Sequence, residues 1–256
     1  MICQIEITTY CNAQCFYCPN EYLPKHHMAL EEFQTIVDNC PKGSTVLMQG
    51  TGEPLLHPRF WEMVVYVKSK NNLNVGIITN GTIPMNEMQL GQIDTLGISV
   101  DTLSAATAER SGRPDLIPII SSVLHYHSLV PGKVRIYAVD FGQDINPLQA
   151  FAKNHGIGLN IQRIQGKSVY QKRYQTPTLP YRYLRCRYIE NEIHRFVFVN
   201  GKHAPCAYMV DSHSALSAEE ISRHFKAGRV PPCCSQCGEL VGIPRLSIKI
   251  EGKRRT

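Results

Sequence analysis

The feature of this 256-residue sequence that most constrains its fold is a regular alternation of strand-like and helix-like segments over its first two-thirds. Apolar residues at helical spacing, such as Leu30, Phe33 and Val37, separate runs that are rich in β-branched residues. Alternating strands and helices form βαβ units with parallel strands and right-handed crossovers. The predicted fold class is therefore α/β, a partial (β/α)6 TIM barrel. Its six strands are expected at Ile2–Thr8, Ser44–Met48, Leu73–Thr79, Thr95–Val100, Lys133–Val139 and Ile157–Gln162.

Polar and glycine-rich groups follow four consecutive predicted strands. The active site of a parallel β/α barrel lies at the carboxyl ends of its strands. A purely structural repeat would not need such groups at four successive strand ends, so the sequence predicts an active site there. The groups are the loop Cys11–Cys18, the turn Gly50–Pro54, the triplet Thr79–Gly81 and the pair Ser99 and Asp101.

The alternation stops after about residue 165, and the rest of the chain has a different character. Pro177 and Pro180 interrupt it, and Asn200-Gly201 predicts a hairpin turn. Few apolar runs remain to build a core, so a metal cluster would help to stabilise this part. The sequence predicts two domains, a barrel over residues 1–165 and a small C-terminal domain over residues 166–256.

Composition and charge narrow the class of protein. A content of 43% hydrophobic and 19% charged residues excludes a disordered chain. No apolar run reaches about 18 residues and no signal peptide precedes the first strand, so a cytoplasmic protein with no membrane partner is expected. The net charge of +6 is uneven, with six basic residues and no acidic one from Lys167 to Arg187. This tyrosine-rich segment suits an anionic small molecule or a nucleic acid, unless it is a solvated linker.

The ten cysteines fall into two groups, and only Cys3 and Cys40 lie outside them. In a reducing compartment such cysteines are more often metal ligands than disulfides. Cys11, Cys15 and Cys18 form the first group, with C-x3-C-x2-C spacing. Three thiolates on one loop can hold three irons of a cubane and leave the fourth iron open to a chelating ligand. A zinc site completed by a distant fourth cysteine is the alternative.

This first group resembles the signature of the radical S-adenosylmethionine (SAM) superfamily, C-x3-C-x-aromatic-C, with Tyr17 in the aromatic position. Gly52-Glu53-Pro54 matches the family's GGEP motif, although Thr51 replaces its first glycine. The resemblance covers roughly residues 1–163. It implies cofactor-binding roles for Gly52 and Glu53 at the methionine amino group, for Ser99 and Asp101 at the ribose, and for Asn80 and Tyr17 at the same mouth.

The resemblance also implies cofactors and an opening step. A [4Fe–4S] cluster on Cys11, Cys15 and Cys18 would bind SAM and pass an electron to its sulfonium. A carbon–sulfur bond then breaks, and a 5′-deoxyadenosyl radical abstracts a substrate hydrogen. The implied partners are a polar or anionic small-molecule substrate and a flavodoxin or ferredoxin that donates the electron. The SAM-binding motifs count against a nucleic-acid partner.

The second cysteine group resembles the twitch and SPASM domains attached to many members of this superfamily. Its C-x14-G-x4-C opening, from Cys186 through Gly201 to Cys206, fits their spacing. The resemblance implies one auxiliary [4Fe–4S] cluster held by Cys186, Cys206, Cys234 and Cys237. Cys233 is a bystander by default, with a ligand in place of Cys234 or a hydrogen-atom donor as the other readings. A structural zinc on four thiolates is the alternative to the cluster.

Within the superfamily the chain is similar to 2-deoxy-scyllo-inosamine dehydrogenase-like enzymes, on its Cys18-Pro19-Asn20 sequence and its final C-x2-C pair. That resemblance implies catalytic roles for Arg163, at the substrate, and for Tyr17, with Arg185 as a weaker match to the position of Arg163. The expected function is oxidation of an alcohol of a biosynthetic intermediate. One alternative is a peptide maturase or epimerase, disfavoured because only ten residues precede Cys11. Another is a non-catalytic iron–sulfur or zinc RNA-binding protein.

Overall fold

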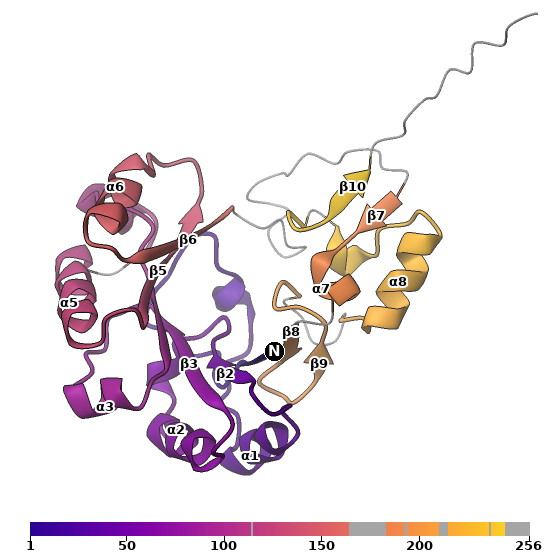
Figure 1. The fold of residues 1–256 in the computed structure, drawn as a ribbon. Helices are drawn as coiled ribbons and strands as arrows, with labels where there is room; N and C mark the ends of the chain where they lie inside the picture. The colour runs from indigo at the N-terminus through magenta and orange to yellow at the C-terminus, as the bar shows by residue number, and fades with distance from the viewer. Residues whose placement is uncertain (114, 164–182, 192–193, 210–214, 236, 244–256) are drawn as a thin grey trace, which may run out of the picture.

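A computed structural model describes residues 1–113, 115–163, 183–191, 194–209, 215–235 and 237–243 of the chain (Figure 1). Residues 167–182 of the basic segment from Lys167 to Arg187 therefore lie outside the described residues. In the described part of the chain, no helix is both long and apolar enough to cross a membrane.

A single sheet confirms the six predicted strands in the predicted order. Each strand pairs in parallel with the next along the chain, so neighbours in sequence are neighbours in space. The α/β fold with a parallel sheet is that of a partial barrel, with its helices on the outer side (Figure 1). The strands are β1 (Ile2–Ile5), β2 (Thr45–Met48), β3 (Asn74–Thr79), β4 (Thr95–Ser99), β5 (Val134–Asp140) and β6 (Gly158–Arg163).

The helices cover the sheet because their apolar residues recur on one face. Leu30, Phe33 and Val37 of α1 are buried, as their spacing predicts. They join one core cluster with side chains of β1 to β5. The helices between the strands are α1 (Leu30–Asp38), α2 (Phe60–Ser69), α3 (Glu87–Gly91), α4 (Ala105–Arg110), α5 (Leu116–Leu129) and α6 (Asn146–Asn154), with short 3-10 turns η1 (Pro19–Tyr22) and η2 (Pro54–Leu56).

The sheet continues beyond the predicted domain boundary. Strand β8 (His194–Val197) pairs in parallel with β1, and β9 (His203–Ala204) pairs with β8 in an antiparallel hairpin. Gly201 turns this hairpin with a φ of 74°, which confirms the predicted turn. The division at residue 165 stays a prediction, but the C-terminal part is joined to the barrel through this shared sheet.

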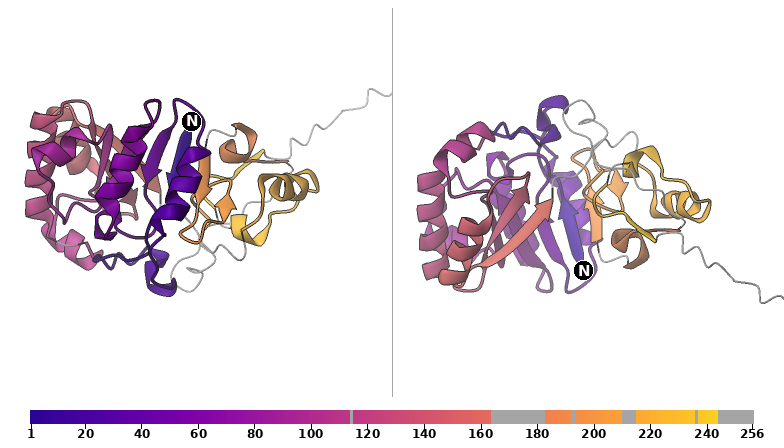
Figure 2. Two further views of the ribbon diagram at one scale, coloured as in Figure 1. Left: turned by 90° about the horizontal axis from the view of Figure 1, so that it is seen from below. Right: turned by 90° about the horizontal axis from the view of Figure 1, so that it is seen from above.

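The remaining C-terminal elements surround the second cysteine group. In Figure 2 they lie beyond β8, at the end of the sheet away from β6. These elements are β7 (Tyr183–Arg185), α7 (Arg187–Asn191), α8 (Ala218–Lys226), η4 (Pro232–Cys234) and β10 (Val241–Ile243), with β7 and β10 paired antiparallel. A small core of buried side chains, including Phe196, Cys206 and Ile221, packs α7, α8 and η4 against the β8–β9 hairpin.

Candidate active site

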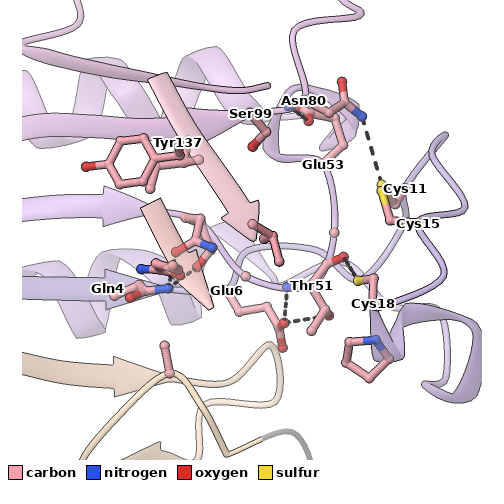
Figure 3. Close-up of a pocket in the computed structure, with 18 of the residues that line it drawn as sticks. Gln4, Glu6, Cys11, Cys15, Cys18, Thr51, Glu53, Asn80, Ser99 and Tyr137 are labelled. Atoms are coloured by element: carbon pink, nitrogen blue, oxygen red, sulfur yellow. Dashed lines mark hydrogen bonds between the residues drawn. The ribbon is translucent and has the colours of Figure 1, made fainter. Parts of the chain in front are cut away.

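A cavity of about 410 Å³ lies at the carboxyl ends of the barrel strands. Figure 3 shows the thiols of Cys11, Cys15 and Cys18 at one end of it, with Gln4 and Tyr137 toward the other. Most of the predicted site residues line this one cavity, although they come from four separate segments. They are Cys11, Cys15, Tyr17, Cys18, Gly52, Glu53, Asn80 and Ser99.

The cysteine loop is held by contacts from three other segments. The side-chain amide of Asn80 lies 4.0 Å from the sulfur of Cys11. The Cys15 and Cys18 thiols each lie 3.9 Å from a carbonyl oxygen, that of Gly112 and of Thr51 respectively. Burial raises the pKa of the Cys11 thiol, so its thiolate form would need a cation such as iron beside it.

The three thiols fit a cluster better than they fit one ion. Within the described ranges, no three His, Cys, Asp or Glu side chains converge closely enough for a single metal ion. A cubane takes its thiolates on separate irons, so its ligands surround a larger body. All three thiols are half-buried and face a shared cavity with room beside them. This donor set therefore fits a three-thiolate iron–sulfur cluster with one open iron.

Glu53 lies beside the cavity with its carboxylate bonded to the chain itself. It is 1% exposed, and it accepts hydrogen bonds from the Thr79 hydroxyl at 2.7 Å and from the Asn80 amide at 2.6 Å. It also caps η2 by accepting from the amide of Leu55 at 3.2 Å. Burial raises the pKa of Glu53, although these three hydrogen bonds act to lower it. The carboxylate thus fixes the end of β3 to the turn after β2, and its contact with an amino group stays a prediction.

The turn after β2 needs glycine because it runs against the backbone beyond β1. A Cβ on Gly52 would lie 2.2 Å from the carbonyl oxygen of Thr8. Thr51, which departs from the family motif, donates from both its amide and its hydroxyl to the Glu6 carboxylate at 2.8 Å. Glu6 is 3% exposed and lines the cavity. Sequence reasoning missed Glu6, although a carboxylate within the expected first strand, among apolar residues, was a usable signal.

Ser99 and Asp101 lie in different surroundings, although Ser99 ends β4 and Asp101 is only two residues further along the chain. Ser99 lines the cavity. The Asp101 carboxylate is 1% exposed and accepts from the Tyr17 hydroxyl and from Arg113, whose Nε lies 2.9 Å away. Whether either side chain contacts a ribose stays a prediction. Sequence reasoning also missed Arg113, since nothing in the local pattern marks it.

Gly112 touches the cysteine loop directly, and its replacement gives a first test of the site. Its φ is 79° and that of Gly132 is 82°, so alanine at either position costs roughly 1–2 kcal/mol through the left-handed backbone. A Cβ on Gly112 would lie 2.1 Å from the Gln14 carbonyl oxygen, whereas nothing lies within 4 Å at Gly132. We expect Gly112→Ala to lose reconstituted iron and Gly132→Ala to retain it, as measured by iron analysis alongside urea unfolding. Equal iron in the two variants would contradict this contact.

The second cysteine group surrounds a separate small hollow. Its lining includes all five cysteines, Cys186, Cys206, Cys233, Cys234 and Cys237. The hollow has a volume of about 20 Å³, so these cysteine side chains would have to move apart to accommodate a cluster. The sulfurs of Cys233 and Cys234 are 4.0 Å apart, and burial raises the pKa of Cys206 to about 12.

The two predicted arginines are not equally placed. The backbone of Arg163 ends β6 opposite Asp140, and its side chain lies outside the described part of the chain. Arg185 ends β7 and forms a two-point ion pair with Glu190, at 2.8 and 2.9 Å, on the exposed surface. Arg185 is therefore already paired, and it lines neither the cavity nor the hollow of the second cysteine group, so it stays the weaker candidate.

Comparison with known proteins identifies a family and several partial relatives. The Radical SAM superfamily model matches residues 5–153. The chain is 36% identical over 112 residues to the tungsten-containing aldehyde ferredoxin oxidoreductase cofactor-modifying protein of Pyrococcus furiosus, covering 40% of this chain and 31% of that protein. It is 27% identical over 169 residues to a probable GTP 3',8-cyclase of Methanocaldococcus jannaschii, covering 62% of this chain and 57% of the cyclase. The chain thus spans less than two-thirds of the length of either relative.

A solved structure shows the same fold. SuiB from Streptococcus suis superposes with a TM-score of 0.59 at 16% identity, covering 86% of this chain and 63% of SuiB. At this identity the similarity concerns the fold alone.

Proposed function

Since the chain belongs to the radical SAM superfamily, we propose that it uses a 5′-deoxyadenosyl radical to oxidise an alcohol of a small polar or anionic intermediate. One observation carries this proposal: the cysteine loop and polar side chains of β1, β5 and β6 line one cavity of about 410 Å³. A cavity of this size suits a small molecule better than a peptide chain. The family match also favours an enzyme over a non-catalytic RNA-binding protein.

Residues at different positions along this cavity would bind the cluster, SAM and the substrate. When bound, the cluster and SAM supply the radical. Cys11, Cys15 and Cys18 would hold the cluster, while the Gly52 turn and Ser99 would hold SAM beside it. Polar side chains at the far end, such as Gln4 and Tyr137, would orient the substrate and leave its reacting C–H facing the cluster end.

Alcohol oxidation removes two hydrogens, and only the first leaves as an atom with the adenosyl radical. The second leaves as a proton to a base, and one further electron must be accepted. We assign that electron to an auxiliary [4Fe–4S] cluster of the twitch type on Cys186, Cys206, Cys234 and Cys237. Tyr188, Tyr208 and Met209 line both the main cavity and the hollow of the second cysteine group, and this shared wall supports the assignment. A flavodoxin or ferredoxin would supply the electron that starts the reaction.

A second candidate is the radical cyclisation of a purine nucleotide. The alignment with a probable GTP 3',8-cyclase over 169 residues favours it. The alignment reaches only 62% of this chain, so substrate contacts outside the aligned part need not agree.

Isotope transfer tests the proposal. We expect anaerobically reconstituted, reduced protein to convert SAM to 5′-deoxyadenosine and to place deuterium in it from a carbon-deuterated aminocyclitol, as read by mass spectrometry. Deuterium transfer from labelled GTP instead would favour the cyclase. Failure to form 5′-deoxyadenosine with any substrate, despite a full cluster, would refute radical chemistry altogether.

A further inference from the structure

The aromatic residue inside the cysteine loop is tied to the barrel by a buried carboxylate. Tyr17 lies between Cys15 and Cys18, and its hydroxyl donates to Oδ2 of Asp101. The ring stacks near Phe141, with centroids 5.9 Å apart and planes 25° from parallel. Tyr17 is therefore held at both its ring and its hydroxyl, which restricts the thiols on either side of it.

Asp101 connects this tyrosine to the two strands behind it. Its Oδ1 accepts from the Val139 amide of β5 at 2.8 Å, and Asp101 itself lies two residues after the end of β4. Its own carbonyl oxygen accepts from the Gln143 side chain at 2.8 Å. Arg113 completes the set, with Nε 2.9 Å from Oδ2 and a second nitrogen 3.5 Å from Oδ1.

These contacts leave the carboxylate little capacity for another partner. An ionised carboxylate offers about four acceptor positions. Tyr17, Val139 and the two nitrogens of Arg113 occupy that number, and the side chain is only 1% exposed. A ribose hydroxyl would have to displace one of them.

The residues next to Arg113 hold the backbone of the same loop. The amide of Gln14 donates to the Gly112 carbonyl at 3.0 Å, and the amide of Phe16 donates to the Ser111 carbonyl at 3.1 Å. The Arg113 guanidinium also lies over the Tyr17 ring, 5.8 Å from its centroid. Backbone and side-chain contacts thus converge on residues 14–17 from one segment.

We propose that Asp101, together with Tyr17 and Arg113, is a positioning device for the cysteine loop that sets the geometry and charge around its cluster, rather than a ribose ligand. The inference rests on the iron–sulfur cluster of the proposed function, but not on its substrate or product. Asp101→Asn would leave the Arg113 charge uncompensated near the cluster, and a nearby positive charge favours the reduced cluster. Tyr17→Phe changes no charge and only frees the loop.

The test compares both variants with matched controls in the reconstituted protein. We expect Asp101→Asn to raise the cluster's midpoint potential and to change its EPR spectrum, and Tyr17→Phe to change the spectrum with a smaller shift in potential. Affinity for SAM should change less than about threefold in either variant, since neither removes a SAM contact. Asp94→Asn is the first control, because Asp94 also accepts from a backbone amide, of Val75, and from a cation, Lys68. Tyr66→Phe is the second, because the Tyr66 hydroxyl donates to Asp38 on the surface.

The outcomes separate the alternatives. A wild-type spectrum and potential in both variants, with SAM affinity reduced about tenfold or more in Asp101→Asn alone, would make Asp101 a ribose ligand and overturn the proposal. Unchanged spectra, potentials and affinities would overturn it as well. Failure of the wild-type protein to assemble a cluster would instead refute the proposed function, so the two failures are distinguishable.

Discussion

Replacing Cys15 with alanine is expected to abolish the formation of 5′-deoxyadenosine from SAM while the protein stays folded. Cys15 is half-buried, and its thiol makes one weak contact, 3.9 Å from the Gly112 carbonyl oxygen, so its loss removes little packing. Two thiolates remain on the loop, which is too few to hold a cubane with one open iron. Bound iron should fall by about four per chain, which is the content of one cubane. Iron analysis and chromatography of the reaction mixture measure both effects.

Cys40→Ala provides the matched control for this experiment. Cys40 is also half-buried, but it follows α1 and donates from its thiol to the Ile36 carbonyl at 3.5 Å, away from the cavity. It should keep wild-type iron and wild-type 5′-deoxyadenosine. Retention of both by Cys15→Ala would show that the triplet does not hold the cluster.

The sequence was sufficient for the barrel because the signal there is local. Apolar spacing within single segments predicted all six strands and the buried face of α1. The first strand is shorter than expected, ending at Ile5 rather than Thr8, since the chain then turns to bridge Thr8 with His27. The pairing of β8 with β1 was beyond such reasoning, because nothing in the C-terminal segment specifies a partner at the opposite end of the chain.

The same contrast holds within the site. The cysteine triplet and the Gly52 turn are contiguous motifs, so they could be recognised residue by residue. Glu6 acts through a contact with Thr51, which lies 45 residues away in sequence. Arg113 acts through a contact with Asp101, which lies 12 residues away. A single sequence records the residue types but not these pairings. For that reason the chemistry of the loop was predictable, and the residues that hold it in place were not.

Replacing Cys234 with alanine is expected to remove about four irons per chain and to leave 5′-deoxyadenosine formation intact. The Cys234 thiol lines the hollow of the second cysteine group, and Cys11, Cys15 and Cys18 line the main cavity. Hydrogen abstraction should therefore continue, while the oxidised product disappears, because the substrate radical has no acceptor for its second electron. Metal binding also stabilises small domains, so unfolding of the C-terminal part should begin at lower urea.

Cys233→Ala is the closest possible control, since Cys233 adjoins Cys234 in sequence and its sulfur lies 4.0 Å away. If Cys234 is the ligand, Cys233→Ala keeps its iron and its oxidised product. The reverse pattern would transfer the ligand role to Cys233. One zinc per chain in place of four irons would rule out an electron-accepting cluster at this site, because zinc has no accessible redox change. An oxidised product from Cys234→Ala would rule it out as well, because the reaction would then not need the cluster as its electron acceptor.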